Sequence, residues 1–246
     1  MIATTIALLL AAVQADNATI ERAIANPARS ETYRALDANR EPAVILAFAG
    51  VRPGLRILDV GTGGGYFTEI LADAVGPGGS VVGWNGPAFA ARPNVQRALG
   101  RIRDRYPATT FYATPTTSMA LPRNRFDLVL LHLTYHDFYW ESADFGMARV
   151  EPRDVAAELY RATKDGGTVV IVDHVAPGGR DTRAEVDATH RIDPAVVRAD
   201  FEAAGFVFDG LSEELRRADD DRTLRVFNPA IRGKTDRFMF RFRKPQ

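Results

Sequence analysis

A short apolar strand that leads into an acidic residue and a glycine-rich turn is the most constraining segment of this chain. Residues 56–67 read RILDVGTGGGYF, and an amphipathic helix is predicted from Tyr66 to Ala74. This order places backbone N–H groups and a helix N-terminus beside a carboxylate, at the sheet edge where open α/β folds bind nucleotides. A dinucleotide fingerprint that starts at Gly61 requires glycine where this chain has Tyr66, so the spacing disfavours an NAD(P) site.

The bulk composition predicts one ordinary globular domain and no nucleic-acid partner. The chain has 246 residues, enough for a single large core. Lys plus Arg and Asp plus Glu both number 31, so no net field favours nucleic acid or an anionic membrane. The absence of cysteine excludes disulfides, thiolate metal sites and cysteine nucleophiles.

The amino-terminal segment resembles a secretory signal peptide. Residues 1–15 read MIATTIALLLAAVQA, which carries no charged side chain and ends in a small-x-small pattern typical of cleavage after Ala15. The apolar run is too short for a transmembrane helix. We expect a periplasmic or secreted protein without stable membrane insertion after cleavage, with one domain over residues 16–246. A buried N-terminal helix or a misassigned start codon would instead leave the protein in the cytoplasm.

Strand and helix patterns alternate along the chain, which predicts a parallel sheet with right-handed crossovers. The last two predicted strands lie close in sequence and indicate an antiparallel hairpin at the sheet edge. The segment 164–167 is predicted to be a turn that ends a helix, and the charged segment 212–235 is a long loop of the kind that is often functional. Helices are expected over 18–25, 30–39, 42–48, 66–74, 94–106, 153–163 and 194–204, and strands over 56–60, 80–84, 110–113, 125–131, 168–173, 206–211 and 238–243.

Several of these features together resemble the class I S-adenosylmethionine (SAM) dependent methyltransferases. They are the D-x-G-x-G-x-G motif that begins at Asp59, the FDLV strand at 126–129, the DGG turn at 165–167 and the closing hairpin. The resemblance covers nearly all of residues 27–244. Segments 133–137, 190–193 and 232–236 are further similar to a group of bacterial predicted methyltransferases that often carry signal peptides.

The resemblance implies a fold, a cofactor and a cofactor site. The fold is the α/β, Rossmann-like methyltransferase fold, with a mostly parallel seven-stranded sheet, an antiparallel C-terminal hairpin and N-terminal helices over 16–50 that act as a lid. The cofactor is SAM. In the family, one acid binds the ribose hydroxyls and a second binds the adenine amino group, whereas this chain has Asn85 and Thr114 at those places. The residues expected to bind the cofactor are Asp59, Gly61, Thr62, Gly63, Gly65, Tyr66, Asn85, Thr114 and His132.

The four histidines of the chain all follow predicted strand ends or crossovers on the carboxyl side of the sheet, so we expect them to gather above the glycine turn. Imidazole is suited to accepting the proton that an oxygen or nitrogen acceptor loses during methyl transfer. We predict no metal site, although converging histidines and carboxylates can hold a divalent ion. The predicted catalytic residues are His136, Asp137, His174 and His190.

Two further groups of residues have two interpretations each. One group is a polar and aromatic stripe that forms either part of the N-terminal lid or a solvated helix face. The other is a set of aromatic residues that forms either the wall of an acceptor pocket or ordinary packing. The stripe is Tyr33, Arg34, Asp37, Arg40 and Pro42, and the aromatic set is Tyr135, Phe138, Tyr139 and Trp140.

We therefore predict a SAM-dependent methyltransferase that acts on a small-molecule acceptor. One alternative is an exported binding protein that keeps the methyltransferase scaffold without catalysis or with an altered ligand. A less favoured alternative is a metal-assisted hydrolase that uses the histidines.

Overall fold

A single seven-stranded sheet forms the centre of the computed structural model, which describes residues 14, 16–143 and 145–246. Its strands are β1 (Arg56–Val60), β2 (Ser80–Asn85), β3 (Thr109–Ala113), β4 (Phe126–His132), β5 (Thr163–His174), β6 (Val207–Ser212) and β7 (Arg237–Arg243). They lie in the order β3-β2-β1-β4-β5-β7-β6. The pairs from β3 to β5 are parallel, and β7 is antiparallel to both β5 and β6. The predicted mostly parallel sheet with an antiparallel C-terminal hairpin is confirmed.

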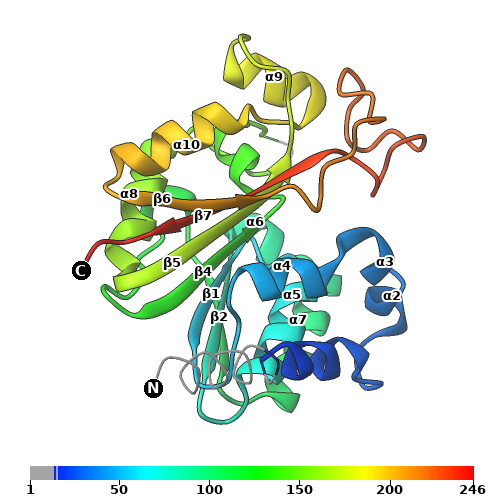
Figure 1. Ribbon diagram of the computed structural model, residues 1–246, viewed down its shortest axis with the longest axis vertical. Helices are drawn as coiled ribbons and strands as arrows, with labels where there is room; N and C mark the ends of the chain where they lie inside the picture. The colour runs from blue at the N-terminus through cyan, green and yellow to red at the C-terminus, as the bar shows by residue number, and fades with distance from the viewer. Residues whose placement is uncertain (1–13, 15, 144) are drawn as a thin grey trace, which may run out of the picture.

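Helices cover both faces of this sheet. They are residues 16–25, α2 (Glu31–Arg34), α3 (Asp37–Arg40), α4 (Pro42–Phe48), α5 (Tyr66–Val75), α6 (Pro87–Ala90), α7 (Pro93–Arg105), α8 (Pro152–Ala162), α9 (Thr182–Thr189) and α10 (Pro194–Ala203), with short 3-10 turns η1 (Thr116–Ser118) and η2 (Tyr135–Tyr139). Helices α4, α5 and α7 lie on one side of the sheet, and α8 and α10 lie on the other (Figure 1). Among the described residues, no helix has the length and apolar character needed to cross a membrane. The predicted leader, residues 1–15, lies outside the described residues except for residue 14.

The strands are apolar on both faces because each face is buried under a helical layer. Along β4, Leu128 and Leu130 join the core that contains α4 and α5, whereas Val129 and Leu131 join the core that contains α8 and α10. All four side chains are at most 1% exposed. This two-sided burial explains why the strand reads as a continuous hydrophobic run rather than as an alternating one.

Two of the predicted local structures are corrected by long-range contacts. The helix expected over 30–39 is divided into α2 and α3, and the division brings Asp37 to within 2.9 Å of Arg29 and 2.6 Å of the Tyr66 hydroxyl. The turn expected at 164–167 is instead an irregular part of β5, where Gly166 (φ 75°) donates its N–H to the Lys244 carbonyl. Pairing with the chain terminus thus overrides the local turn signal.

The turn after β1 requires glycine for two separate reasons. Gly61 has φ 70°, which is costly for any residue with a Cβ atom. A Cβ atom there would also lie only 2.4 Å from Cγ2 of Thr134, in the segment that leaves the neighbouring strand β4. The glycine turn and the chain that follows β4 are therefore in direct contact.

We expect Gly61→Ala to destabilise the protein by about 2–4 kcal/mol, through backbone strain and overpacking against a β-branched side chain. Gly50→Ala is the matched control, because Gly50 has φ 68° and open space around its Cβ position. It should cost about 1 kcal/mol at most, since the strain is partly offset by a less flexible unfolded chain. Urea unfolding of both variants measures the difference, and equal losses would contradict the close contact with Thr134.

Candidate cofactor and acceptor site

A cavity of about 1030 Å³ lies where the carboxyl ends of β1, β2, β4 and β5 meet. The strand order reverses between β1 and β4, since β2 and β3 lie on one side of β1 and the later strands on the other. Open α/β sheets bind their ligands at such a reversal. Residues of the glycine turn and all four histidines line this one cavity, which also receives side chains from the long loop after β6.

Contacts to the end of β2 hold the glycine turn in place. The N–H groups of Gly61 and Thr62 both donate to the Trp84 carbonyl, at 2.9 and 3.0 Å. The Asn85 side chain accepts a hydrogen bond from the Gly63 N–H at 2.9 Å and donates one to the Gly63 carbonyl at 3.0 Å. A carboxylate at this position could make only the first of these two bonds, because it has no donor. The amide of Asn85 is therefore specifically complementary to the turn.

Asp59 lies buried beneath the glycine turn. Its Oδ2 atom accepts hydrogen bonds from the hydroxyls of Thr68, at 2.5 Å, and Thr62, at 3.0 Å. Burial raises the pKa of Asp59 to about 6, although these hydrogen bonds and the nearby charge of Arg40 act in the opposite direction. The Asp59 carboxyl therefore loses its proton only as the pH approaches neutrality.

The N-terminal helices reach the same turn from above. The Tyr33 hydroxyl donates to the Gly64 carbonyl at 2.6 Å, and the Arg40 guanidinium lies 4.3 Å from the centre of the Tyr66 ring. The Tyr66 hydroxyl in turn donates to Asp37. Tyr33 and Arg40 line the cavity, whereas Arg34, Asp37 and Pro42 do not. Part of the predicted stripe thus faces the cavity and fixes the start of α5.

The segment between β4 and η2 is strained. Leu133 lines the cavity and has φ 55°, a conformation that costs roughly 1–2 kcal/mol for a residue with a Cβ atom. The Leu133 N–H donates to the Val172 carbonyl at 2.7 Å, and the Thr134 hydroxyl donates to the His132 carbonyl at 3.1 Å. These bonds hold the sharp turn that directs His136 into the cavity.

Asp173, at the end of β5, organises the histidines. It is fully buried and accepts hydrogen bonds from the backbone N–H groups of His136, at 3.0 Å, and His174, at 2.8 Å. Nδ1 of His136 lies 2.7 Å from the same carboxylate, and Nε2 lies 3.3 Å from Asp137. Burial lowers the pKa of His136, but the two carboxylates outweigh it and raise that pKa to about 9. Hereafter His136, Asp137, Asp173, His174 and His190 are called the histidine cluster.

The other two histidines of the histidine cluster have lowered pKa values. Nδ1 of His190 lies 3.1 Å from the Val186 carbonyl and 3.3 Å from the Arg225 guanidinium, and Nε2 lies 4.0 Å from Asp137. Burial, followed by the charges of His136 and Arg225, lowers the pKa of His190 to about 4. Burial also holds the pKa of His174 well below its usual range.

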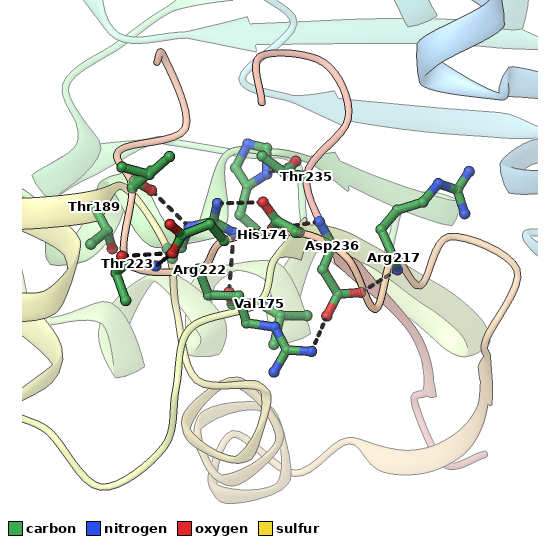
Figure 2. A network of polar contacts seen from close by, with 12 residues as sticks. His174, Val175, Thr189, Arg217, Arg222, Thr223, Thr235 and Asp236 are labelled. Atoms are coloured by element: carbon green, nitrogen blue, oxygen red, sulfur yellow. Dashed lines mark hydrogen bonds and ion pairs between the residues drawn. The ribbon is translucent and has the colours of Figure 1, made fainter. Parts of the chain in front are cut away.

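The long loop after β6 is fixed to the site by buried charges. Figure 2 shows His174 beside Thr235, whose hydroxyl lies 2.7 Å from Nδ1 of the ring. The neighbouring Asp236 pairs with Arg222 at 2.7 Å, and its N–H donates to Asp220 at 2.7 Å. Asp220 also pairs with Arg191 at 2.7 Å, and both of these side chains are fully buried. This loop supplies Arg225, Val226, Phe227 and Arg232 to the cavity lining.

The structure brings together most of the residues that the sequence predicts for the site. Two predicted cofactor residues do not line the cavity. Thr114 is occupied by the Trp84 indole, at 2.9 Å, and by the Met119 carbonyl, at 2.7 Å, while Gly65 (φ 94°) forms the N-cap of α5. The predicted site residues that do line the cavity are Asp59, Gly61, Thr62, Gly63, Tyr66, Asn85, His132, His136, Asp137, His174 and His190.

The aromatic wall of the cavity differs in part from the predicted one. Phe138 and Trp140 line the cavity, but Tyr135 is buried against Phe201 and bonds to Asp200. The hydroxyl of Tyr139 also bonds to Asp200. The sequence analysis missed the aromatic lining residues that come from β2, α5, α6 and two loops, and the length of the loop after β6 was the only signal for one of them. The missed aromatic lining residues are Phe67, Trp84, Phe89, Phe145 and Phe227.

These features define a nucleotide-type site on a methyltransferase scaffold, and sequence comparison agrees. A family described as "Methyltransferase domain" matches residues 52–217. The chain therefore belongs to this methyltransferase family.

Known relatives and structures are similar over different lengths. The chain is 31% identical over 132 residues to the ubiquinone/menaquinone biosynthesis C-methyltransferase UbiE of Burkholderia orbicola, which is 53% of this chain and 48% of that enzyme. It thus spans about half the length of the curated relatives it matches. A SAM-dependent methyltransferase from Aquifex aeolicus is similar in fold, with a TM-score of 0.57, 19% identity, and coverage of 92% of this chain and 97% of that one. Aeropyrum pernix fibrillarin with natively bound SAM has a TM-score of 0.51 and 16% identity, over 84% and 76% of the two chains.

The raised pKa of Asp59 predicts a pH-dependent contribution to stability. An acid whose pKa is about 6 when folded and near 4 when unfolded binds more protons in the folded state, so its contribution is greatest at low pH and is lost as pH rises through 6. We expect the free energy of unfolding of wild type, minus that of Asp59→Asn, to fall by about 2–3 kcal/mol between pH 4 and 7.

Asp59→Asn is a suitable comparison because its amide oxygen can keep both threonine bonds, which converge on a single oxygen in the wild type. Urea unfolding of both proteins at several pH values measures the difference. A difference that stays flat, or that rises with pH, would show that Asp59 is not held in its protonated form.

Proposed function

We propose that the protein transfers the methyl group of SAM to a small acceptor with an aromatic or otherwise apolar body. The observation that supports this most is a single cavity that combines the glycine turn, the histidine cluster and an aromatic wall. Aromatic rings bury large apolar areas and stack on flat ligands. The rings that line the cavity are Tyr33, Tyr66, Phe67, Trp84, Phe89, Phe138, Trp140, Phe145 and Phe227.

The chemistry requires a place for one proton. A bond forms between an acceptor atom and the methyl carbon while the bond from that carbon to sulfur breaks, which leaves S-adenosylhomocysteine. An oxygen, nitrogen or ring-carbon acceptor then loses a proton, and we assign the histidine cluster to receive it, with His174 and His190 as candidate acceptors because their pKa values are lowered. The carboxylates of Asp173 and Asp137 raise the pKa of His136 to about 9, which leaves that ring protonated near neutral pH and removes it from the predicted bases.

Likeness to an enzyme whose name describes C-methylation in quinone biosynthesis supports a ring carbon as one candidate target. The aromatic wall fits a flat ring equally well whether carbon or oxygen receives the methyl group. A phenolic or quinol ring is therefore the acceptor class that we favour.

A non-catalytic binding protein on the same scaffold is the second candidate. It is supported by Asn85 and Thr114, which stand where the wider family has acids and which both bond within the protein. Turnover of any acceptor would exclude it.

We expect S-adenosylhomocysteine to bind the purified protein, and Asn85→Ala to weaken binding by about tenfold, because it frees the Gly63 backbone groups and removes a polar lining residue. Asn94→Ala, which removes an exposed side chain on α7, is the matched control and should bind as wild type does. Isothermal titration calorimetry gives both affinities.

The catalytic part of the proposal is tested with methyl-labelled SAM and a set of phenols, quinols and their non-aromatic analogues. Transfer of label to the aromatic acceptors and not to the analogues is the expected result. Cofactor binding without transfer to any acceptor in the set would favour the non-catalytic alternative.

We also propose that the protein is exported and cleaved after Ala15, as the first 15 residues suggest. The amino terminus of the protein recovered from cells that make the full chain should then be Asp16. Amino-terminal sequencing reads this directly, and recovery of a chain that still begins at Met1 would contradict export by this route.

A further inference from the structure

We propose that His136, Asp137 and His190 bind a divalent first-row transition-metal ion of the zinc type in the cavity. One ligand atom from each of these three residues lies within 4.8 Å of the other two. The inference goes beyond methyl transfer, because it concerns a metal site that neither the glycine turn nor the cofactor requires.

The positions of the three ligand atoms suit a single small ion. Asp137 Oδ1 lies 3.3 Å from Nε2 of His136 and 4.0 Å from Nε2 of His190. Ligand atoms around a tetrahedral zinc ion lie roughly 3.3 Å apart, given bonds of about 2.0–2.1 Å. The first distance already matches this value, and the second requires a shift of less than about 1 Å.

Both imidazole rings are also held in the way that metal-binding histidines are held. Such a histidine usually donates its second ring N–H to a carboxylate or a backbone carbonyl, which fixes the ring and leaves the other nitrogen free to bind the metal. Nδ1 of His136 lies 2.7 Å from Asp173, and Nδ1 of His190 lies 3.1 Å from the Val186 carbonyl and 3.3 Å from the Arg225 guanidinium. An ion bound at Nε2 of His190 would place the ring proton on Nδ1, which then donates to the Val186 carbonyl. The two Nε2 atoms then face the same carboxylate, that of Asp137.

Charge at this place favours a cation. The carboxylates of Asp137 and Asp173 both converge on His136, and two carboxylates in a buried setting need positive charge nearby. His136 and His190 are buried, whereas Asp137 is partly open to the cavity. All three line the cavity, so a fourth coordination position would face a bound molecule, as in zinc sites that act on ligands.

The ligand set also limits which metals fit. Two imidazoles and one carboxylate suit zinc, cobalt, iron(II) and manganese, whereas magnesium and calcium prefer sites built from oxygen alone. The competing explanation is that a proton, not a metal ion, joins His136 to the two carboxylates. Direct metal binding separates the two explanations.

The test uses the full chain, stripped with EDTA and titrated with Zn²⁺ by calorimetry in the absence of SAM and of any acceptor. We expect one Zn²⁺ per chain and no binding of Mg²⁺ under the same conditions. Replacement with Co²⁺ gives a second readout, because a four-coordinate nitrogen and oxygen site gives cobalt a visible absorption spectrum that the aqueous ion lacks.

Two variants remove one ligand each with little disturbance. Asp137→Ala alters a partly exposed side chain, and His190→Asn keeps a residue type that tolerates the left-handed backbone at this position, where φ is 56°. Each of these two variants should weaken Zn²⁺ binding by at least about 100-fold. Asp173→Asn should weaken it less, by about 10–100-fold, because Asp173 only orients the ligand His136. Asp154→Ala is the matched control for Asp137→Ala, because it removes an exposed carboxylate of α8 that does not line the cavity, and it should bind Zn²⁺ as wild type does.

Thermal unfolding confirms that each variant is folded. The proposal is overturned if the wild type binds less than one Zn²⁺ per chain, or if the ligand variants bind as well as wild type, since the metal would then sit adventitiously elsewhere. Because the titration contains neither cofactor nor acceptor, its result is independent of whether the proposed methyl transfer is observed.

Discussion

The parallel pairing of β1 with β4 is the constraint on which the whole site depends. Adjacent parallel strands deliver the chain segments after their carboxyl ends to one place, so the glycine turn after β1 and the strained turn after β4 must pack together. The contact is close enough that Gly61 has no room for a Cβ atom beside Thr134. A glycine-rich turn and a group of titratable side chains, about 70 residues apart in sequence, therefore line the same cavity.

Asp173 has a comparable role within the histidine cluster. A fully buried carboxylate is costly unless its oxygens accept hydrogen bonds, and here two backbone N–H groups and one imidazole supply them. Both backbone donors belong to histidines, so satisfying this charge also fixes where His136 and His174 lie. The hydrogen bonds that offset the cost of burying Asp173 therefore also hold His136 and His174 in place.

Sequence patterns predicted the sheet well because burial on both faces leaves continuous apolar runs, and the D-x-G-x-G-x-G spacing located the glycine turn that lines the cavity. They predicted less where tertiary contacts decide the structure. Thr114 follows the expected strand, but its hydroxyl bonds to Trp84 and Met119, and nothing in the local sequence indicates those partners. The left-handed backbone at His190, which ends α9 and sets the direction of the ring, is likewise absent from any local pattern.

Asn85 holds the glycine turn through both ends of its side-chain amide. A carboxylate here would offer a cofactor hydroxyl a stronger, charge-assisted bond. The amide instead donates to and accepts from Gly63, so it holds the turn in one conformation before any ligand arrives. A rigid site loses less conformational entropy on binding, which offsets part of the weaker direct contact. The glycine turn, Asn85 and the Tyr33 hydroxyl above it therefore form a cradle that is already held in one conformation by hydrogen bonds within the protein.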